Sequence, residues 1–166
     1  SDMYVKNIPE EIAEFDIRIL NMKECGYEYN FRLIESTDEG MKALGLLTNL
    51  EELYLDRNGL DKIPDAVFNC TKLRIISMHN NGSLNKVQPE IKNLKDLEYL
   101  DLDCGTWDPI DFPDEIMELS KLKELKVSHL SHKTDEVKAA YTQRLHDLFG
   151  ERVALNYYGL KKIVYN

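Results

Sequence analysis

The sequence predicts an α/β solenoid: a right-handed coil with a short parallel β-sheet on its concave face and helical or irregular arms on its convex side. Two repeated patterns lead to this fold class, and they run in step at a spacing of 23 to 25 residues. Hydrophobic residues make up 43% of the 166 residues, which is enough for a continuous core.

The first pattern is an apolar frame, LxxLxLxxN, which predicts one short strand in each coil. Copies begin at residues 17, 50, 73, 97 and 122, so successive copies lie 33, 23, 24 and 25 residues apart. Leu53 and Leu55 share one face of a strand, and a strand this short must pair with the copies on either side. The frame positions are Ile17, Leu20, Met22 and Cys25; Leu50, Leu53, Leu55 and Asn58; Leu73, Ile76, Met78 and Asn81; Leu97, Leu100, Leu102 and Gly105; and Leu122, Leu125, Val127 and Leu130.

The last position of the frame favours a side chain that bonds backbone groups where the strand turns away. Asn58 and Asn81 suit this role, because a short amide side chain both donates and accepts. Cys25 holds the position in the first copy. Gly105 and Leu130 have no side-chain group for such a bond, so we expect the bonding to end towards the C-terminal copies.

The second pattern places a proline between apolar residues after each strand. Proline fixes φ and removes a backbone donor, so it suits an outer arm that pairs with no strand. An apolar pair follows each copy, such as Ile91 and Leu94, and points the arm back into the core. The prolines are Pro9, Pro64, Pro89 and Pro113.

These patterns together resemble the leucine-rich repeat family, and the proline-bearing half is similar to its bacterial and Ras-associated repeat types. The resemblance covers about residues 8–156. It implies that the asparagine positions form a ladder inside the coil, where cysteine is a known substitute. It also implies that function lies in the strand residues that alternate with the core leucines.

Two insertions interrupt the repeat. Residues 27–33 alternate aromatic or apolar with polar side chains, which indicates an extended segment, and Ser36-Thr37-Asp38-Glu39 is typical of a helix start. Met41, Leu44 and Leu47 would line the inner face of that helix, although its two glycines weaken it. The second insertion, Thr106-Trp107-Asp108-Pro109, is predicted to be a surface loop.

The C-terminal region departs from the repeat and is predicted to cap the coil. Thr134 is a candidate N-cap and Gly150 a candidate stop, and Arg152–Asn156 indicates one further strand. The predicted inner face of the helix is Val137, Tyr141, Leu145 and Leu148, and Tyr157, Tyr158, Ile163, Val164 and Tyr165 would finish the cap. We therefore predict one domain over residues 1–166, with a partial repeat or cap at 4–16, repeats at 17–133 interrupted at about 27–47, and a cap at 134–166.

Composition narrows the classes of function. The formal net charge of −9 argues against nucleic acid and anionic membranes as partners, and no apolar run is long enough to span a bilayer. Cys25, Cys70 and Cys104 show no disulfide or CxxC spacing, and the N-terminus shows no charged leader followed by an apolar stretch. These features favour a monomer in the cytoplasm, with a secreted or surface-anchored protein as the alternative.

Function is expected on the concave face, where the side chains between the core leucines form four columns. The columns contain six acidic and three basic residues, for a net charge of about −3 when histidine is counted as neutral. We predict a protein-binding site there for a partner with a basic or polar surface, because aromatic anchors among charged groups are typical of interfaces. The predicted binding residues are Tyr54, Asp56, Ile75, His79, Tyr99, Asp101 and Asp103. The columns are Ile19, Glu52, Ile75, Tyr99 and Glu124; Asn21, Tyr54, Ser77, Asp101 and Lys126; Lys23, Asp56, His79, Asp103 and Ser128; and Glu24, Arg57, Asn80, Cys104 and His129.

The alternatives are enzymatic, metal-binding or carbohydrate-binding. Cys104 and His129, with Asp103 as orienting group, are the only candidate nucleophilic set, and His132 adds a candidate metal ligand. An open concave sheet lacks the water-excluding pocket that catalysis favours, so the prediction is a non-catalytic module without cofactor or metal. Two alternatives stay open: a recognition domain of a larger enzyme, receptor or secreted effector, and a cell-surface protein that stacks sugars on Trp107 and the tyrosines.

Overall fold

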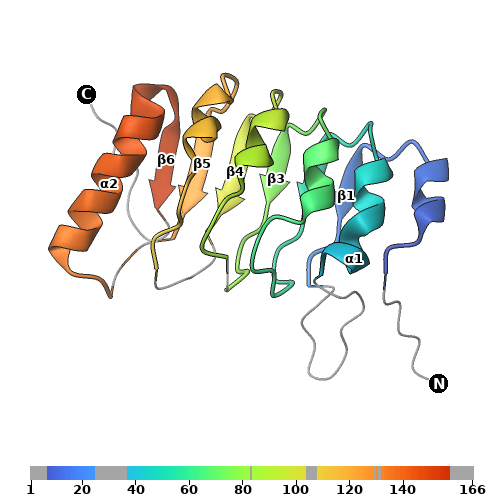
Figure 1. Cartoon of the computed structure of the whole chain (residues 1–166), viewed down its shortest axis with the longest axis horizontal. Helices are drawn as coiled ribbons and strands as arrows, with labels where there is room; N and C mark the ends of the chain where they lie inside the picture. The colour runs from blue at the N-terminus through green and yellow to red at the C-terminus, as the bar shows by residue number, and fades with distance from the viewer. Residues whose placement is uncertain are drawn as a thin grey trace.

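The residues that the structure describes form a single open sheet of six parallel strands, in sequence order from β1 to β6 (Figure 1). The computed structural model describes residues 7–24, 37–82, 84–103, 108–128, 130 and 132–157. Each strand has only three or four residues, so it is held mainly by its neighbours. The strands are β1 (Ile19–Asn21), β2 (Glu52–Tyr54), β3 (Ile75–Ser77), β4 (Tyr99–Leu102), β5 (Glu124–Val127) and β6 (Ala154–Tyr157).

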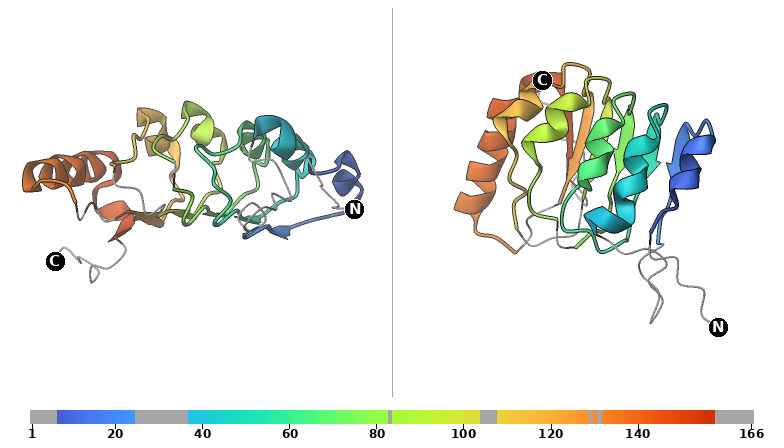
Figure 2. Two further views of the ribbon diagram at one scale, coloured as in Figure 1. Left: turned by 90° about the horizontal axis from the view of Figure 1, so that it is seen from below. Right: turned by 45° about the vertical axis from the view of Figure 1, so that its right-hand side comes forward.

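Short 3₁₀ helices return the chain along the convex side, so the molecule has a strand layer and a helical layer (Figure 2). Three of these arms begin directly after a proline, and η4 begins on Pro89 itself. The predicted outer proline arms are therefore confirmed. The arms are η1 (Glu10–Glu14), η2 (Lys42–Leu46), η3 (Asp65–Asn69), η4 (Pro89–Asn93) and η5 (Asp114–Glu118).

The core is the stack of frame leucines between the two layers. The central frame residues of β2 to β5 are completely buried, whereas Leu20 of β1 is only half-buried. Packing thus becomes looser at the N-terminal end, where Phe15 and Ile19 are exposed. The four fully buried residues are Leu53, Ile76, Leu100 and Leu125.

The asparagine ladder forms inside the coil as the resemblance implies. Asn81 donates through Nδ2 to the carbonyls of Leu55 and Met78, at 2.9 and 2.8 Å. Its Oδ1 accepts from the backbone N–H groups of Asn58 and Leu60, at 2.9 and 3.1 Å. Asn58 repeats the role one coil earlier, because its Nδ2 donates to the Met22 carbonyl at 2.8 Å. Buried backbone groups at the turn are satisfied in this way.

The chain leaves the sheet through a left-handed residue after the strand. Glu24, Arg57 and Asn80 have φ of 61°, 56° and 60° at the same repeat position. A non-glycine residue in this region is uncommon, so its recurrence shows that the turn geometry is set by the coil.

The first insertion ends in a helix that changes type after one turn. α1 (Asp38–Met41) begins at Thr37, whose Oγ1 accepts from the Gly40 N–H at 3.2 Å, and continues as η2. Gly45 explains the tight packing of η2 on η3, because a Cβ there would lie 3.0 Å from the Asn69 side chain. The predicted inner residues Met41, Leu44 and Leu47 are all buried.

The C-terminal end is covered by α2 (Asp135–Phe149), followed by η6 (Gly150–Arg152) and β6. Thr134 is its N-cap and Gly150, with φ 55°, its C-cap, as predicted. Val137 is exposed, so its place in the predicted inner face is wrong. The buried face instead ends on Phe149, whose ring meets Phe112 edge-on at 5.9 Å. The Arg152 guanidinium ties this end to η5 by donating to the Leu119 and Met117 carbonyls.

Candidate functional site

The described members of the four predicted columns lie on the concave face, whereas Cys104 and His129 of the fourth column lie outside the described residues. Strand pairing places Glu52, Ile75 and Tyr99 side by side in the first column, and Tyr54, Ser77 and Asp101 side by side in the second. Backbone pairing continues past the strand ends into the third and fourth columns, because Glu24 N–H donates to the Asp56 carbonyl and Arg57 N–H to that of His79. Residues from five successive coils, such as Lys23 and Lys126, thus share one surface.

These columns line a shallow hollow of about 520 Å³ over β2, β3 and β4. All seven predicted binding residues line it, together with three that we did not predict. The three are Lys23, Ser77 and Lys126. Their columns identified them as concave-face residues, but a lysine or serine alone gave no signal that distinguished it from an ordinary surface residue.

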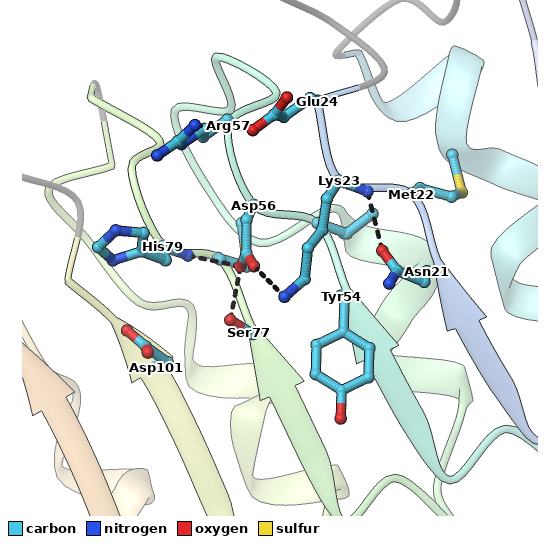
Figure 3. A network of polar contacts seen from close by, with 12 residues as sticks. Asn21, Met22, Lys23, Glu24, Tyr54, Asp56, Arg57, Ser77, His79 and Asp101 are labelled. Atoms are coloured by element: carbon cyan, nitrogen blue, oxygen red, sulfur yellow. Dashed lines mark hydrogen bonds and ion pairs between the residues drawn. The ribbon is translucent and has the colours of Figure 1, made fainter.

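Asp56 organises the first half of the hollow (Figure 3). Its Oδ1 accepts from Ser77 Oγ at 2.5 Å and from the His79 backbone N–H at 3.0 Å. Its Oδ2 lies 2.8 Å from Lys23 Nζ. The Asp56 side chain is 10% exposed and that of Lys23 is 43% exposed, so a buried carboxylate meets a partly exposed lysine.

Asp101 organises the second half in a similar way. Its Oδ1 accepts from the Asp103 backbone N–H at 3.0 Å, and its Oδ2 from the Tyr99 hydroxyl at 3.1 Å. Lys126 Nζ lies 3.7 Å from the same Oδ2. His79 Nδ1, between the two halves, lies 3.8 Å from Asp103 Oδ2.

The two lysines also lie over the two tyrosine rings. Lys23 Nζ is 4.8 Å from the ring centroid of Tyr54, and Lys126 Nζ is 5.1 Å from that of Tyr99. Both distances are within the range of a cation–π interaction. Each half of the hollow therefore holds an ammonium group between an aromatic face and a carboxylate.

Both tyrosines are neutral at ordinary pH and keep a hydroxyl for hydrogen bonding. The hydrogen bond from Tyr54 to Glu52 Oε2, at 2.8 Å, raises the pKa of Tyr54, because ionisation would bring two negative charges together. Burial raises the pKa of Tyr99. The pKa of Lys126 is also raised, by its interaction with Tyr99.

The candidate catalytic, metal-binding and carbohydrate-binding sets are only partly described. Cys104, Trp107 and His129 lie outside the described residues, whereas Asp103, His132 and the tyrosines of the hollow are placed. Within the ranges that the structure describes, no three His, Cys, Asp or Glu side chains are grouped to hold a metal ion. Cys70 is buried, and burial raises the pKa of its thiol to about 11, which makes it a poor nucleophile.

Comparison with known proteins agrees with the repeat and the fold. A family model described as "Leucine rich repeat" matches residues 48–104. The human PH domain leucine-rich repeat-containing protein phosphatase 1 is 31% identical over 96 residues, which span 55% of this chain and 5% of that protein. The human volume-regulated anion channel subunit LRRC8A is 61% identical over 31 residues, or 19% of this chain and 4% of the subunit.

A solved structure extends the likeness to most of the chain. A leucine-rich repeat protein of Leptospira interrogans superposes with a TM-score of 0.64 and 21% identity, over 91% of this chain and 34% of that one. The repeated frame, asparagine ladder and parallel strands agree with this likeness: residues 48–104 match the leucine-rich repeat model, and the chain has the fold of a leucine-rich repeat protein. Its fold is one that serves in general as a protein-interaction module. Among the helices described, none combines the length and apolarity needed to cross a membrane.

Proposed function

We propose that this chain is a non-catalytic module that binds a protein segment in the hollow of its concave face. One observation carries the proposal: Ile75 and Tyr99, which lie side by side, and Tyr54 in the neighbouring column form an apolar band that stays partly exposed and is bordered by buried carboxylates. Aromatic side chains bury a large area with few rotatable bonds, so they are effective anchors at interfaces.

The carboxylates suit recognition better than reaction chemistry. Asp56 and Asp101 are held by hydrogen bonds from their neighbours, so their oxygens are fixed before a partner arrives. Preorganised acceptors reduce the ordering cost of association. The hollow is shallow and lies on an open sheet, which supports contact with a protruding segment of a partner.

A second candidate is that the chain serves as the recognition part of a larger protein. The matched segments span only 5% of the phosphatase and 4% of the channel subunit, so these repeats occur there beside much longer sequences. In that case the hollow would select the partner and the remaining segments would act on it.

Capture of partners from a cell lysate tests the concave-face proposal. The immobilised protein would be compared with Tyr54→Ala/Tyr99→Ala and with a matched control, Leu46→Ala/Met117→Ala. The control removes two apolar side chains that are exposed on the convex arms. Thermal unfolding would first establish that all three proteins are folded.

We expect the tyrosine variant to lose at least about tenfold in recovery of specific partners, because truncating a central aromatic anchor costs about 2 kcal/mol or more. The control variant should recover them like the unmodified protein. Equal recovery by the tyrosine variant would overturn the proposal.

A further inference from the structure

The two halves of the hollow have the same construction. Each half has a tyrosine on an inner strand and an aspartate two residues later. Tyr54 ends β2 and Asp56 follows that strand, whereas Tyr99 and Asp101 both lie in β4. A lysine from the adjacent outer strand lies opposite the aspartate. The lysines are Lys23, next to β1, and Lys126, in β5. The two halves flank β3, which contributes Ile75 and Ser77 between them.

Each half is a complete site for a cation. Lys23 Nζ lies 4.8 Å from the Tyr54 ring centroid and 2.8 Å from a carboxylate oxygen. Lys126 Nζ lies 5.1 Å from the Tyr99 ring centroid and 3.7 Å from a carboxylate oxygen. An aromatic face and a desolvated carboxylate together favour an organic cation over water. The protein's own lysines occupy both sites.

The two components of each site differ in how firmly they are held. The Asp56 and Asp101 side chains are 10% and 9% exposed and accept hydrogen bonds from strand or turn residues. The Lys23 and Lys126 side chains are 43% and 39% exposed. Each lysine stem reaches the solvent, so its ammonium can exchange the carboxylate for water without any movement of the strands. The acceptors are fixed and the cations are exchangeable.

Arginine is the better occupant of such a site. Its planar guanidinium stacks on an aromatic face, bonds a carboxylate with two N–H groups, and is more weakly hydrated than an ammonium. An arginine that displaces Lys23 or Lys126 would return that lysine to water. The charge at the carboxylate would then be balanced by the partner.

We infer that the hollow binds a partner segment through two arginine side chains, which displace Lys23 and Lys126 from their tyrosine–aspartate sites. This inference rests on the proposed concave-face function and names the partner chemistry. Two strand spacings, about 10 Å, separate the inner strands, and the register places Tyr54 level with Asp101, so the two sites are also offset by two residues, about 7 Å, along the strands. The sites therefore lie about 12 Å apart on a diagonal across β3, which carries Ile75. An extended segment with arginine, an apolar residue and arginine at alternate positions places its two arginines about 13 Å apart on one face, which matches that distance.

The test uses a defined probe, the peptide acetyl-Arg-Ser-Leu-Ser-Arg-amide, and its analogue with citrulline in place of both arginines. Citrulline keeps the shape of arginine and removes the charge. Binding to the full chain would be measured by isothermal titration calorimetry. The decisive variant is Lys23→Met/Lys126→Met, which removes both displaced ammonium groups and keeps most of each stem.

A matched control corrects for net charge. Lys95→Met/Lys121→Met also removes two lysines, but these pair with Glu118, at the end of η5, and with Asp96, in the turn before β4, and none of the four lines the hollow. If the double variant in the hollow fails to fold, Lys126→Met alone serves, because its ion pair is the longer of the two.

We expect the arginine peptide to bind at least about fivefold more tightly to Lys23→Met/Lys126→Met than to the unmodified protein, a difference of about 1 kcal/mol. The control variant should differ by less than about twofold, and the citrulline peptide should show no gain. Equal or weaker binding after loss of the lysines, or no binding of the arginine peptide, would overturn the inference. In that case the proposed function would still be supported if the Tyr54→Ala/Tyr99→Ala variant captured less partner than the unmodified protein. If that variant captured partners as well as the unmodified protein, both the proposed function and this inference would be overturned.

Discussion

The asparagine ladder inside the coil and the carboxylates of the hollow are both buried, polar and repeated from coil to coil, yet they bond different groups. Asn81 bonds four backbone groups and no side chain. Asp56 bonds one backbone group, the Ser77 hydroxyl and a solvated lysine. A buried polar side chain that bonds backbone is part of the fold, whereas one that holds an exchangeable side chain is available to a partner.

The largest expected effect lies in the ladder. Asn81→Ala leaves two buried N–H groups and two buried carbonyls without this partner, and each such group is expensive to leave unsatisfied. We expect the free energy of unfolding, measured by urea denaturation, to fall by about 3 kcal/mol. The exposed Asn93→Ala is the control and should change it by less than about 0.5 kcal/mol. A small effect of Asn81→Ala would mean that the ladder does not hold the coil together.

A smaller loss of stability is expected from the first carboxylate of the hollow. Asp56→Ala removes the acceptor of Ser77 Oγ and of the His79 N–H, so the free energy of unfolding should fall by about 2 kcal/mol. Asp56→Asn keeps one oxygen acceptor and should recover part of that loss. If the two variants were equally destabilised, hydrogen bonding by Asp56 would not be the source of the effect.

The exchangeable lysine should contribute least to folding. Lys23→Met is expected to lower the free energy of unfolding by about 1 kcal/mol or less, because the Lys23 side chain is 43% exposed and Asp56 keeps its hydrogen bonds from Ser77 and His79 in the variant. Urea denaturation in low and high salt would measure the small difference and its screening. A loss as large as that of Asn81→Ala would make Lys23 a structural residue and would break the contrast between fixed acceptors and exchangeable cations.

Exposed charge pairs outside the hollow provide a pH-dependent reference. Glu98 lies between Arg74 and Lys123, and hydrogen bonds from Lys123 and Arg74 lower its carboxyl pKa from 4.5 to about 2. A carboxyl whose pKa is lower in the folded state stabilises the fold above pH 4.5 and loses that contribution as pH falls towards 2. The difference in stability between the unmodified protein and Glu98→Gln should therefore shrink over that range in urea titrations. A difference that stayed constant would show that the pKa of Glu98 does not differ between the folded and unfolded states.

The repeat made most of the fold predictable from sequence. A frame recurring every 23 to 25 residues fixes strand pairing, and pairing fixes which side chains share a row, so Tyr54, Ile75 and Tyr99 could be placed together before any coordinates. Val137 could not be placed, because helical periodicity does not say which end of a helical stripe the core reaches.

The lysines of the hollow were not predictable for a related reason. Column membership gives the Cβ direction of Lys23 and Lys126 but not the rotamer of a four-carbon stem. Only the structure shows that each ammonium turns towards a tyrosine ring and an aspartate. Two of the three bases already counted in the predicted charge of the face therefore lie against its aspartates.

Oxidative footprinting of the captured complex tests the concave-face proposal most directly. Hydroxyl radicals would modify the protein alone and with its partner bound, and mass spectrometry would read oxidation at Tyr54 and Tyr99 against the exposed convex residues Leu46 and Met117. We predict that the partner protects both tyrosines and leaves Leu46 and Met117 as reactive as before. Protection of Leu46 and Met117 with unchanged oxidation of the tyrosines would place the partner on the convex side and contradict the proposal.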